Sequence, residues 1–433
     1  MQLFVFMRKV KNMLKMIRGR RWGLLWDRMP FAKVIFTLTN FIPHPQSYKY
    51  IILGGHGVGL TAFLHYLESI HAKPCQVLTY EAVRPFIFWR KFNGFSKQSS
   101  DGLVFDKAPL NAYAPSIFKS LKYKVPLYQI IRDPISIIKS NINVSMFHAI
   151  SKINSQEDAS NYLFLTIDHI EHLMFHFTSE RALVSHIASE VHYLRMRDID
   201  DSGMLHTMQS FASKFGYNLD SQSSDVVGGG GKFTLKSSNN KLPSSYISTQ
   251  LHISDNTPTY LDSIQESAIK GSLFPRCFPY VFEYNNEIFV LSTPSRLNGQ
   301  SIQEVDMITL AKRPHIKEYY PIKHYVVQNY EQYPLILASV KSINISSIQQ
   351  DELNQKIQKY IHYVFEMLKK HKDYEFTEER IIATLLNNQS YAKDLAYKIH
   401  RELDILRCDF PNILDEFIHT KKFLSYFNLD KGE

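Results

Sequence analysis

Short apolar runs alternate with segments of helical periodicity along the first half of the chain. The apolar runs predict strands at 48–53, 73–80, 125–131 and 191–196. Apolar residues three to four positions apart predict helices between them, at 62–70, 113–121, 162–189 and 204–215. Strands that alternate with helices form a parallel, doubly wound sheet covered by helices. The predicted fold class is therefore α/β.

The second half follows a different pattern. Four consecutive glycines at 228–231, among Ser and Asn, indicate a loop or a domain boundary. Two apolar runs, at 280–284 and 287–291, flank Asn285-Asn286 and predict a β-hairpin. Apolar residues at helical spacing, with many charged residues between them, predict a C-terminal helical extension with helices at 350–371, 377–407 and 411–427. We divide the chain into an N-terminal arm (1–45), an α/β domain (46–220), a Gly/Ser-rich linker (221–250), a mixed segment (251–340) and a helical extension (341–433).

Positive charge is concentrated in the N-terminal arm. The 433-residue chain has a net charge of +9, and residues 1–40 contribute +8 of it through nine basic residues and one acid. Aromatic and aliphatic residues separate these charges, as in a helix that lies on an anionic membrane surface, although the segment is too charged to span a bilayer. A solvated helix packed on its own domain is the alternative. We expect peripheral membrane contact through residues 1–30, no nucleic-acid partner and, from three widely spaced cysteines, a cytoplasmic protein.

A glycine-rich turn follows the first predicted strand. In GGHGVGLT at 54–61, Gly54, Gly59 and Thr61 occupy the glycine and hydroxyl positions of a phosphate-binding P-loop, where backbone N–H groups and a helix N-terminus surround an anion. The lysine position of that motif is Leu60, which disfavours an ordinary ATPase or kinase. Glycines also make tight turns between strands and helices, so the loop alone does not decide its role.

A second pattern lies downstream, in VPLYQIIRDPISIIKS at 125–140. The apolar run ends at Arg132-Asp133, and Pro134 is well suited to the first turn of a helix. Ser140 then lies two turns into that helix. A guanidinium offers a planar set of donors to a phosphate, and a hydroxyl adds a neutral donor. Arg132 and Ser140 are therefore candidate phosphate ligands, and a strand-edge arginine with an unused helix hydroxyl is the alternative.

These segments, in this order, resemble the sulfotransferases that use 3′-phosphoadenosine 5′-phosphosulfate (PAPS). GGHGVGLT at 54–61 is similar to their 5′-phosphosulfate loop, DKAP at 106–109 resembles their central lysine motif, and 193–216 approximates their closing strand and helix. Arg132 and Ser140 match their 3′-phosphate motif. The last helices resemble, more weakly, an uncharacterised epsilonproteobacterial family that often carries such a core. The likeness implies a P-loop-type α/β fold over 46–220 that binds PAPS through Gly55, Gly57, Val58, Gly59, Leu60, Thr61, Arg132 and Ser140.

The chain departs from this pattern inside the loop. Many sulfotransferases place a lysine or arginine there, and the corresponding residue here is Gly57, next to His56. The resemblance makes Lys107 the replacement, because the family's central lysine approaches the transferred group, and His56 can contribute when protonated. A base must also accept the acceptor's proton. The candidates are Glu81, His56 and Asp106, with Glu81 at a place similar to that of the glutamate in heparan-type enzymes.

The expected function is transfer of a sulfuryl group from PAPS to a hydroxyl or amine. A surface glycan or a lipid-linked saccharide would suit an enzyme with a membrane-facing arm. The chemistry requires no metal as the family performs it. A non-catalytic nucleotide- or glycan-binding protein is the alternative, and a P-loop kinase is a third reading that Leu60 disfavours.

Overall fold

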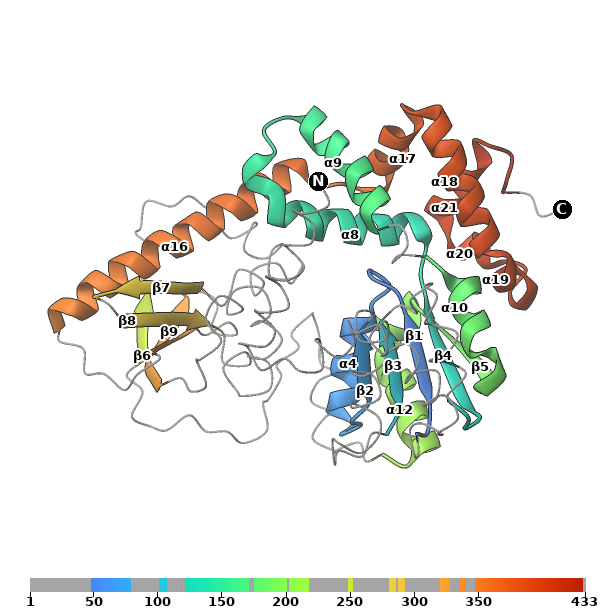
Figure 1. Ribbon diagram of the computed structural model, residues 1–433, viewed down its shortest axis with the longest axis horizontal. Coiled ribbons are helices and arrows are strands. Elements are labelled where there is room, and N and C mark those ends of the chain that lie inside the picture. Colours follow the sequence, from blue (N-terminus) through green and yellow to red (C-terminus); the bar gives the residue numbers. More distant parts are fainter. Residues whose placement is uncertain are drawn as a thin grey trace, which may run out of the picture. The chain divides into compact units, whose positions relative to one another are not determined.

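The computed structural model of the protein (Figure 1) describes residues 48–78, 101–106, 118, 121–170, 175–200, 202–217, 248–251, 280–285, 287–292, 320–327, 335–339 and 347–430. The chain divides into two compact units. The first contains Met1–Asn143, Ser160–Gly231 and Phe376–Glu433, and the second contains Val144–Ala159 and Lys232–Glu375. Residues 341–433, predicted as one helical extension, are thus shared between the two units.

A five-stranded sheet forms the centre of the first unit. Its strands are β1 (Ile51–Gly54), β2 (Cys75–Leu78), β3 (Leu103–Asp106), β4 (Val125–Ile131) and β5 (Ala188–Arg195), in the order β2-β3-β1-β4-β5. All neighbouring strands are parallel. The α/β class with a parallel sheet and flanking helices is confirmed. β3 was not predicted, because its four residues LVFD are too short to show a period.

The alternation of side chains along the strands buries both faces of this sheet. On one face, Tyr50 and Tyr128 pack against Phe211 of α12 (Met204–Phe215), with ring centroids 4.8 and 5.0 Å away. Helix α4 (Leu60–Ser69) joins this face through Phe63, 6.1 Å from Phe211. The opposite face forms an apolar core with residues of α10 (Phe177–Val184) and the turn after it: Ile51, Leu53, Leu103, Phe105, Phe118, Leu121, Val125, Leu127, Val184 and Ile187.

The predicted helix at 162–189 is wrong as a single element. The chain forms α9 (Gln156–Ile170) and then α10, followed by a short 3-10 turn into β5. The backbone N–H groups of Thr178 and Ser179, in the first turn of α10, donate to the Glu402 carboxylate at 3.1 and 3.3 Å. A residue more than 200 positions away therefore caps the second helix, and local periodicity cannot reveal that break.

Most of the C-terminal helices belong to the first unit. They are α17 (Glu378–Leu386), α18 (Gln389–Glu402), α19 (Asp404–Asp409), α20 (Ile413–Glu416) and α21 (Ile418–Ser425). The first unit also contains α11 (Met196–Ile199) and the first part of α8 (Pro134–Ala149), which Pro134 opens as predicted. Gly216 ends α12 in the left-handed conformation, with φ +72°, in agreement with the predicted end of that helix.

The second unit has its own sheet and core. Its strands are β6 (Ser248–Leu251), β7 (Tyr280–Tyr284), β8 (Glu287–Ser292), β9 (Tyr320–Val327) and β10 (Leu335–Ser339), in the order β6-β9-β10-β8-β7. The antiparallel pair β7–β8 is the predicted hairpin. Helix α16 (Ser347–Tyr374) packs on this sheet with a stripe of buried residues three to four positions apart: Leu353, Ile357, Ile361, Val364, Phe365 and Leu368.

Candidate anion-binding site

The glycine loop follows β1, the strand at which the order of strand addition in the sheet reverses. The chain passes from β1 to β2 on the far side of β3, and later from β3 across β1 to β4. In open parallel sheets, ligands bind in the crevice at the carboxyl ends of the strands at such a point. Gly54 pairs with Asp106, so the ends of β1 and β3 lie side by side at this edge. Arg132 directly follows β4 at the same edge.

The backbone of the loop requires glycine at two positions. Gly57 and Gly59 have φ values of +85° and +99°, which other residues rarely adopt. A Cβ on Gly57 would lie 2.6 Å from Asn141 Nδ2, and one on Gly59 would lie 2.8 Å from Ile199 Cδ1. Asn141 of α8 also donates through Nδ2 to the His56 carbonyl at 2.9 Å. The loop therefore packs closely on α8 and α11.

Only backbone groups are available for a ligand over much of the loop. The side chains of Val58 and Leu60 are buried, with Leu60 only 6% exposed, whereas Thr61 is exposed. Helix α4 begins at Leu60, and Phe63 N–H donates to the Gly59 carbonyl at 3.1 Å. The N–H groups of the residues before Phe63 have no acceptor one turn earlier in the helix, and they carry the positive end of its dipole. This arrangement suits an anion, but Leu60 contributes no charge.

We expect Gly57→Ala to weaken anion binding beyond its effect on stability. An alanine there combines a left-handed backbone, which costs about 1–2 kcal/mol, with overlap on Asn141. Gly216→Ala is the matched control, because its φ is +72° and a Cβ would meet nothing within 4 Å. The melting temperature should fall in both variants. Affinity for adenosine 3′,5′-bisphosphate, the ligand expected from the sequence, should fall by about tenfold or more in Gly57→Ala alone. Equal affinities in the two variants would contradict this role of the loop.

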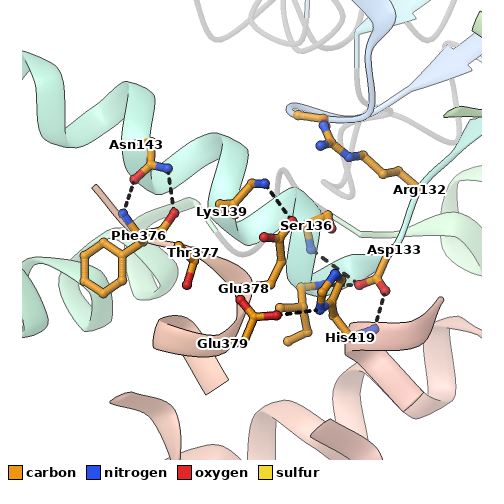
Figure 2. A network of polar contacts seen from close by, with 12 residues as sticks. Arg132, Asp133, Ser136, Lys139, Asn143, Phe376, Thr377, Glu378, Glu379 and His419 are labelled. Atoms are coloured by element: carbon orange, nitrogen blue, oxygen red, sulfur yellow. Dashed lines mark hydrogen bonds and ion pairs between the residues drawn. The ribbon is translucent and has the colours of Figure 1, made fainter. Parts of the chain in front are cut away.

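Arg132, which is drawn in Figure 2, makes a direct contact with the loop. Its Nη1 donates to the Gly57 carbonyl at 2.8 Å. Burial lowers the pKa of this guanidinium, while the charges of Glu378 and Asp133 act in the opposite direction. An arginine remains protonated in such surroundings and has further N–H donors.

Ser140 lies close to the same glycine. Its Cβ is 3.3 Å from the position that a Cβ on Gly57 would take. Arg132 and Ser140, eight positions apart in the sequence, therefore converge on Gly57.

His56 and Asp106 form a second contact at this edge. His56 Nε2 lies 3.4 Å from Asp106 Oδ1, and the two side chains are 46% and 17% exposed. Lys107 and Glu81, the other predicted catalytic residues, lie outside the described residues.

A carboxylate that the sequence analysis did not identify stands beside Arg132. Glu378, the first residue of α17, accepts from Lys139 Nζ at 2.7 Å and from Ser136 Oγ at 3.0 Å (Figure 2). Burial raises the pKa of Glu378, but hydrogen bonds, first of all that from Lys139, outweigh it and leave the pKa below its usual value. The charge of Lys139 is thus already compensated. The capping sequence Thr377-Glu378-Glu379 was the available signal for this helix start.

Asp133 has a structural role that links α8 to α21. Its Oδ1 accepts from Ile135 N–H at 2.9 Å, at the start of α8. Its Oδ2 accepts from His419 and Thr420 N–H at 3.0 and 3.2 Å, at the start of α21. Thr420 Oγ1 also donates to Oδ1 at 2.6 Å. One carboxylate therefore caps two helices, with its neighbours shown in Figure 2.

The C-terminal helices meet α8 at a further point. The Asn143 side chain donates to the Phe376 carbonyl at 3.0 Å and accepts from the Phe376 N–H at 2.9 Å (Figure 2). This pairing fixes the chain just before α17. The helix that carries Ser140 and Asn141 is thus held in place by α17 and α21.

The fold defines an α/β protein whose sheet edge carries a candidate backbone anion site between β1 and α4. Comparison with known proteins adds no relative, since no family model, no curated protein and no solved structure matches the chain. Within the described ranges, no three His, Cys, Asp or Glu residues are grouped so that they could hold a metal ion. In those same parts of the chain, no helix has the length and apolar character needed to cross a membrane.

Proposed function

We propose that this protein is a P-loop-type sulfotransferase that uses PAPS as the sulfuryl donor. The observation that carries the proposal is that Arg132 and Ser140 both lie against Gly57 of the glycine loop. The backbone amides of 55–61 would bind the 5′-phosphosulfate at the N-terminus of α4. The remaining donors of Arg132, together with the Ser140 hydroxyl, would bind the 3′-phosphate. The ordered resemblance of residues 48–220 to this family supplies the nature of the nucleotide.

The reaction asks mainly for alignment and for positive charge against the leaving phosphate. The acceptor's hydroxyl or amine attacks sulfur while the bond from sulfur to the bridging oxygen breaks. The electron pair leaves with adenosine 3′,5′-bisphosphate, and the acceptor's proton passes to a base. Lys107 would stabilise the transferred group, and Glu81, His56 and Asp106 are the candidates for the base. An acceptor such as a surface glycan or a lipid-linked saccharide would suit the basic arm at 1–30.

A non-catalytic nucleotide-binding protein is the second candidate function. The observation that favours it is the burial of Leu60, since the position that carries a lysine in nucleotide-hydrolysing P-loops lies in the core here. Such a protein would bind the nucleotide without transferring the sulfuryl group.

Turnover of sulfur-labelled PAPS over a panel of saccharides, amino sugars and phenols separates the two functions. If the protein is a sulfotransferase, label should appear on at least one acceptor class, and an equal amount of adenosine 3′,5′-bisphosphate should be released. Arg132→Ala, assayed in parallel, should lose this transfer. Binding of the bisphosphate without label on any acceptor would favour the non-catalytic protein instead.

A further inference from the structure

We propose that Asn141 of α8 is a positioning residue of the glycine loop, which aims backbone amides of the loop at the 5′-phosphate or phosphosulfate of the nucleotide. The inference rests on the proposed nucleotide site and adds a residue to it. In this role Asn141 does not contact the ligand and acts through the backbone that does. Recognition of the 5′ group then depends on the same helix that carries Ser140.

The Asn141 side chain is buried, and both hydrogens of its amide are used. The residue is 7% exposed. Its Nδ2 donates to the Ile137 carbonyl, one turn earlier in α8, and to the His56 carbonyl in the loop, each at 2.9 Å. The bond within α8 fixes the orientation of the amide, so its second hydrogen points at the loop. The link between helix and loop is therefore a directed hydrogen bond in a buried place.

Two successive carbonyls of the loop are held by side chains. Asn141 holds the carbonyl of His56, and Arg132 Nη1 donates to that of Gly57 at 2.8 Å. A peptide unit is planar and trans, so its N–H points away from its C=O. Fixing these two carbonyls therefore fixes the directions of the Gly57 and Val58 amides, which point away from the groups that hold the carbonyls. These amides are among those that would bind an anion at the start of α4.

The loop packs directly on the turn of α8 that carries Asn141. A Cβ on Gly57 would lie 2.6 Å from Asn141 Nδ2 and 3.3 Å from Ser140 Cβ. Gly57 has a left-handed φ of +85°, and the lack of a side chain lets the loop approach the helix this closely. Ser140, a proposed 3′-phosphate ligand, and Asn141 are adjacent in α8. The two ends of the nucleotide site therefore share one helix.

The test compares variants of the full chain by isothermal titration with AMP, adenosine 3′-monophosphate and adenosine 3′,5′-bisphosphate. Asn141→Ser leaves a hydroxyl that can donate to the carbonyl one turn earlier but is too short to hold the loop. Its affinity for AMP and for the bisphosphate should each fall by about tenfold, and that for the 3′-monophosphate by less than about twofold. The preference for the bisphosphate over AMP should persist, whereas Arg132→Ala should lose it.

Gln129→Met is the matched control. Gln129 of β4 is a second buried amide, 1% exposed, and its Nε2 donates to the Phe177 carbonyl at 2.9 Å. Its partner opens α10 and is not part of the loop. The melting temperature should fall in both variants, and nucleotide affinity should fall only in Asn141→Ser. Asn141→Leu, which fills more of the space of the lost amide, is a second variant and should show the same pattern of affinities.

The outcomes separate this inference from a structural role and from the proposed function. Unchanged affinity for AMP in Asn141→Ser would overturn the role of Asn141 and leave the nucleotide site intact. Equal losses for all three ligands, or the same loss in Gln129→Met, would also overturn it, because Asn141 would then only stabilise the fold. Selective weakening of the 5′-phosphates, with no preference for the bisphosphate in the wild-type protein, would support the inference and contradict the proposed donor. Absence of nucleotide binding by the wild-type protein would overturn both.

Discussion

Replacing Asp133 by alanine is expected to lower the free energy of unfolding of the first unit by about 2–4 kcal/mol. A single N-cap is worth about 0.5–2 kcal/mol, and this carboxylate caps both α8 and α21. Its loss also leaves the Thr420 hydroxyl without the acceptor at 2.6 Å in a buried position. The loss should therefore exceed that of an ordinary cap.

Hydrogen exchange locates this effect better than a single melting temperature, because a chain of two units need not unfold in one step. Amide protection should fall at the first turns of both α8 and α21 and remain unchanged in α12. Asp133→Asn retains an acceptor oxygen and should show a smaller loss at both places. If only α8 lost protection, the link between the two helices would be wrong.

Replacing Arg132 by alanine is expected to reduce affinity for adenosine 3′,5′-bisphosphate by about 10- to 100-fold. Hydrogen bonds to charged groups are worth about 1.5–3 kcal/mol, and Arg132 would supply those to the 3′-phosphate. It also donates to the Gly57 carbonyl at 2.8 Å, so its removal should loosen the glycine loop. Binding of adenosine 5′-phosphosulfate, which lacks the 3′-phosphate, should weaken as well but by less.

Two controls sharpen this result. Arg132→Lys keeps the charge but loses the planar set of donors, and should recover only part of the affinity. Arg197→Ala removes another arginine, which is 59% exposed and pairs with Glu416 at 3.2 Å, and should change affinity by less than about twofold. Equal losses for the bisphosphate and the phosphosulfate in Arg132→Ala would assign Arg132 to loop support alone.

Local patterns in the sequence predict much of the parallel sheet and part of the site. The glycine turn after an apolar run places the loop between β1 and α4, and the helical period places Ser140 two turns after Pro134. Arg132, at the end of β4, is predictable for the same reason. The apolar run that forms β4 and the glycine that ends α12 are likewise local signals.

The contacts that hold the site together join residues far apart in the sequence. Glu378 reaches Lys139 and Ser136, and Glu402 caps α10, from more than 200 positions away. Asp133 could be recognised as a cap of α8 from its position before Pro134, but nothing near it indicates α21. Asn141 is one residue beyond the predicted ligand Ser140, and only the packing of α8 on the loop reveals its contact with His56.

Isothermal titration of the purified chain with adenosine 3′,5′-bisphosphate, against AMP, ATP and adenosine 5′-phosphosulfate, tests the central claim most directly. The account predicts micromolar binding of the bisphosphate, at least about tenfold tighter than AMP, with the preference lost in Arg132→Ala. Equal affinity for the bisphosphate and AMP would contradict it. In that case Arg132 and Ser140 would serve only to support the glycine loop.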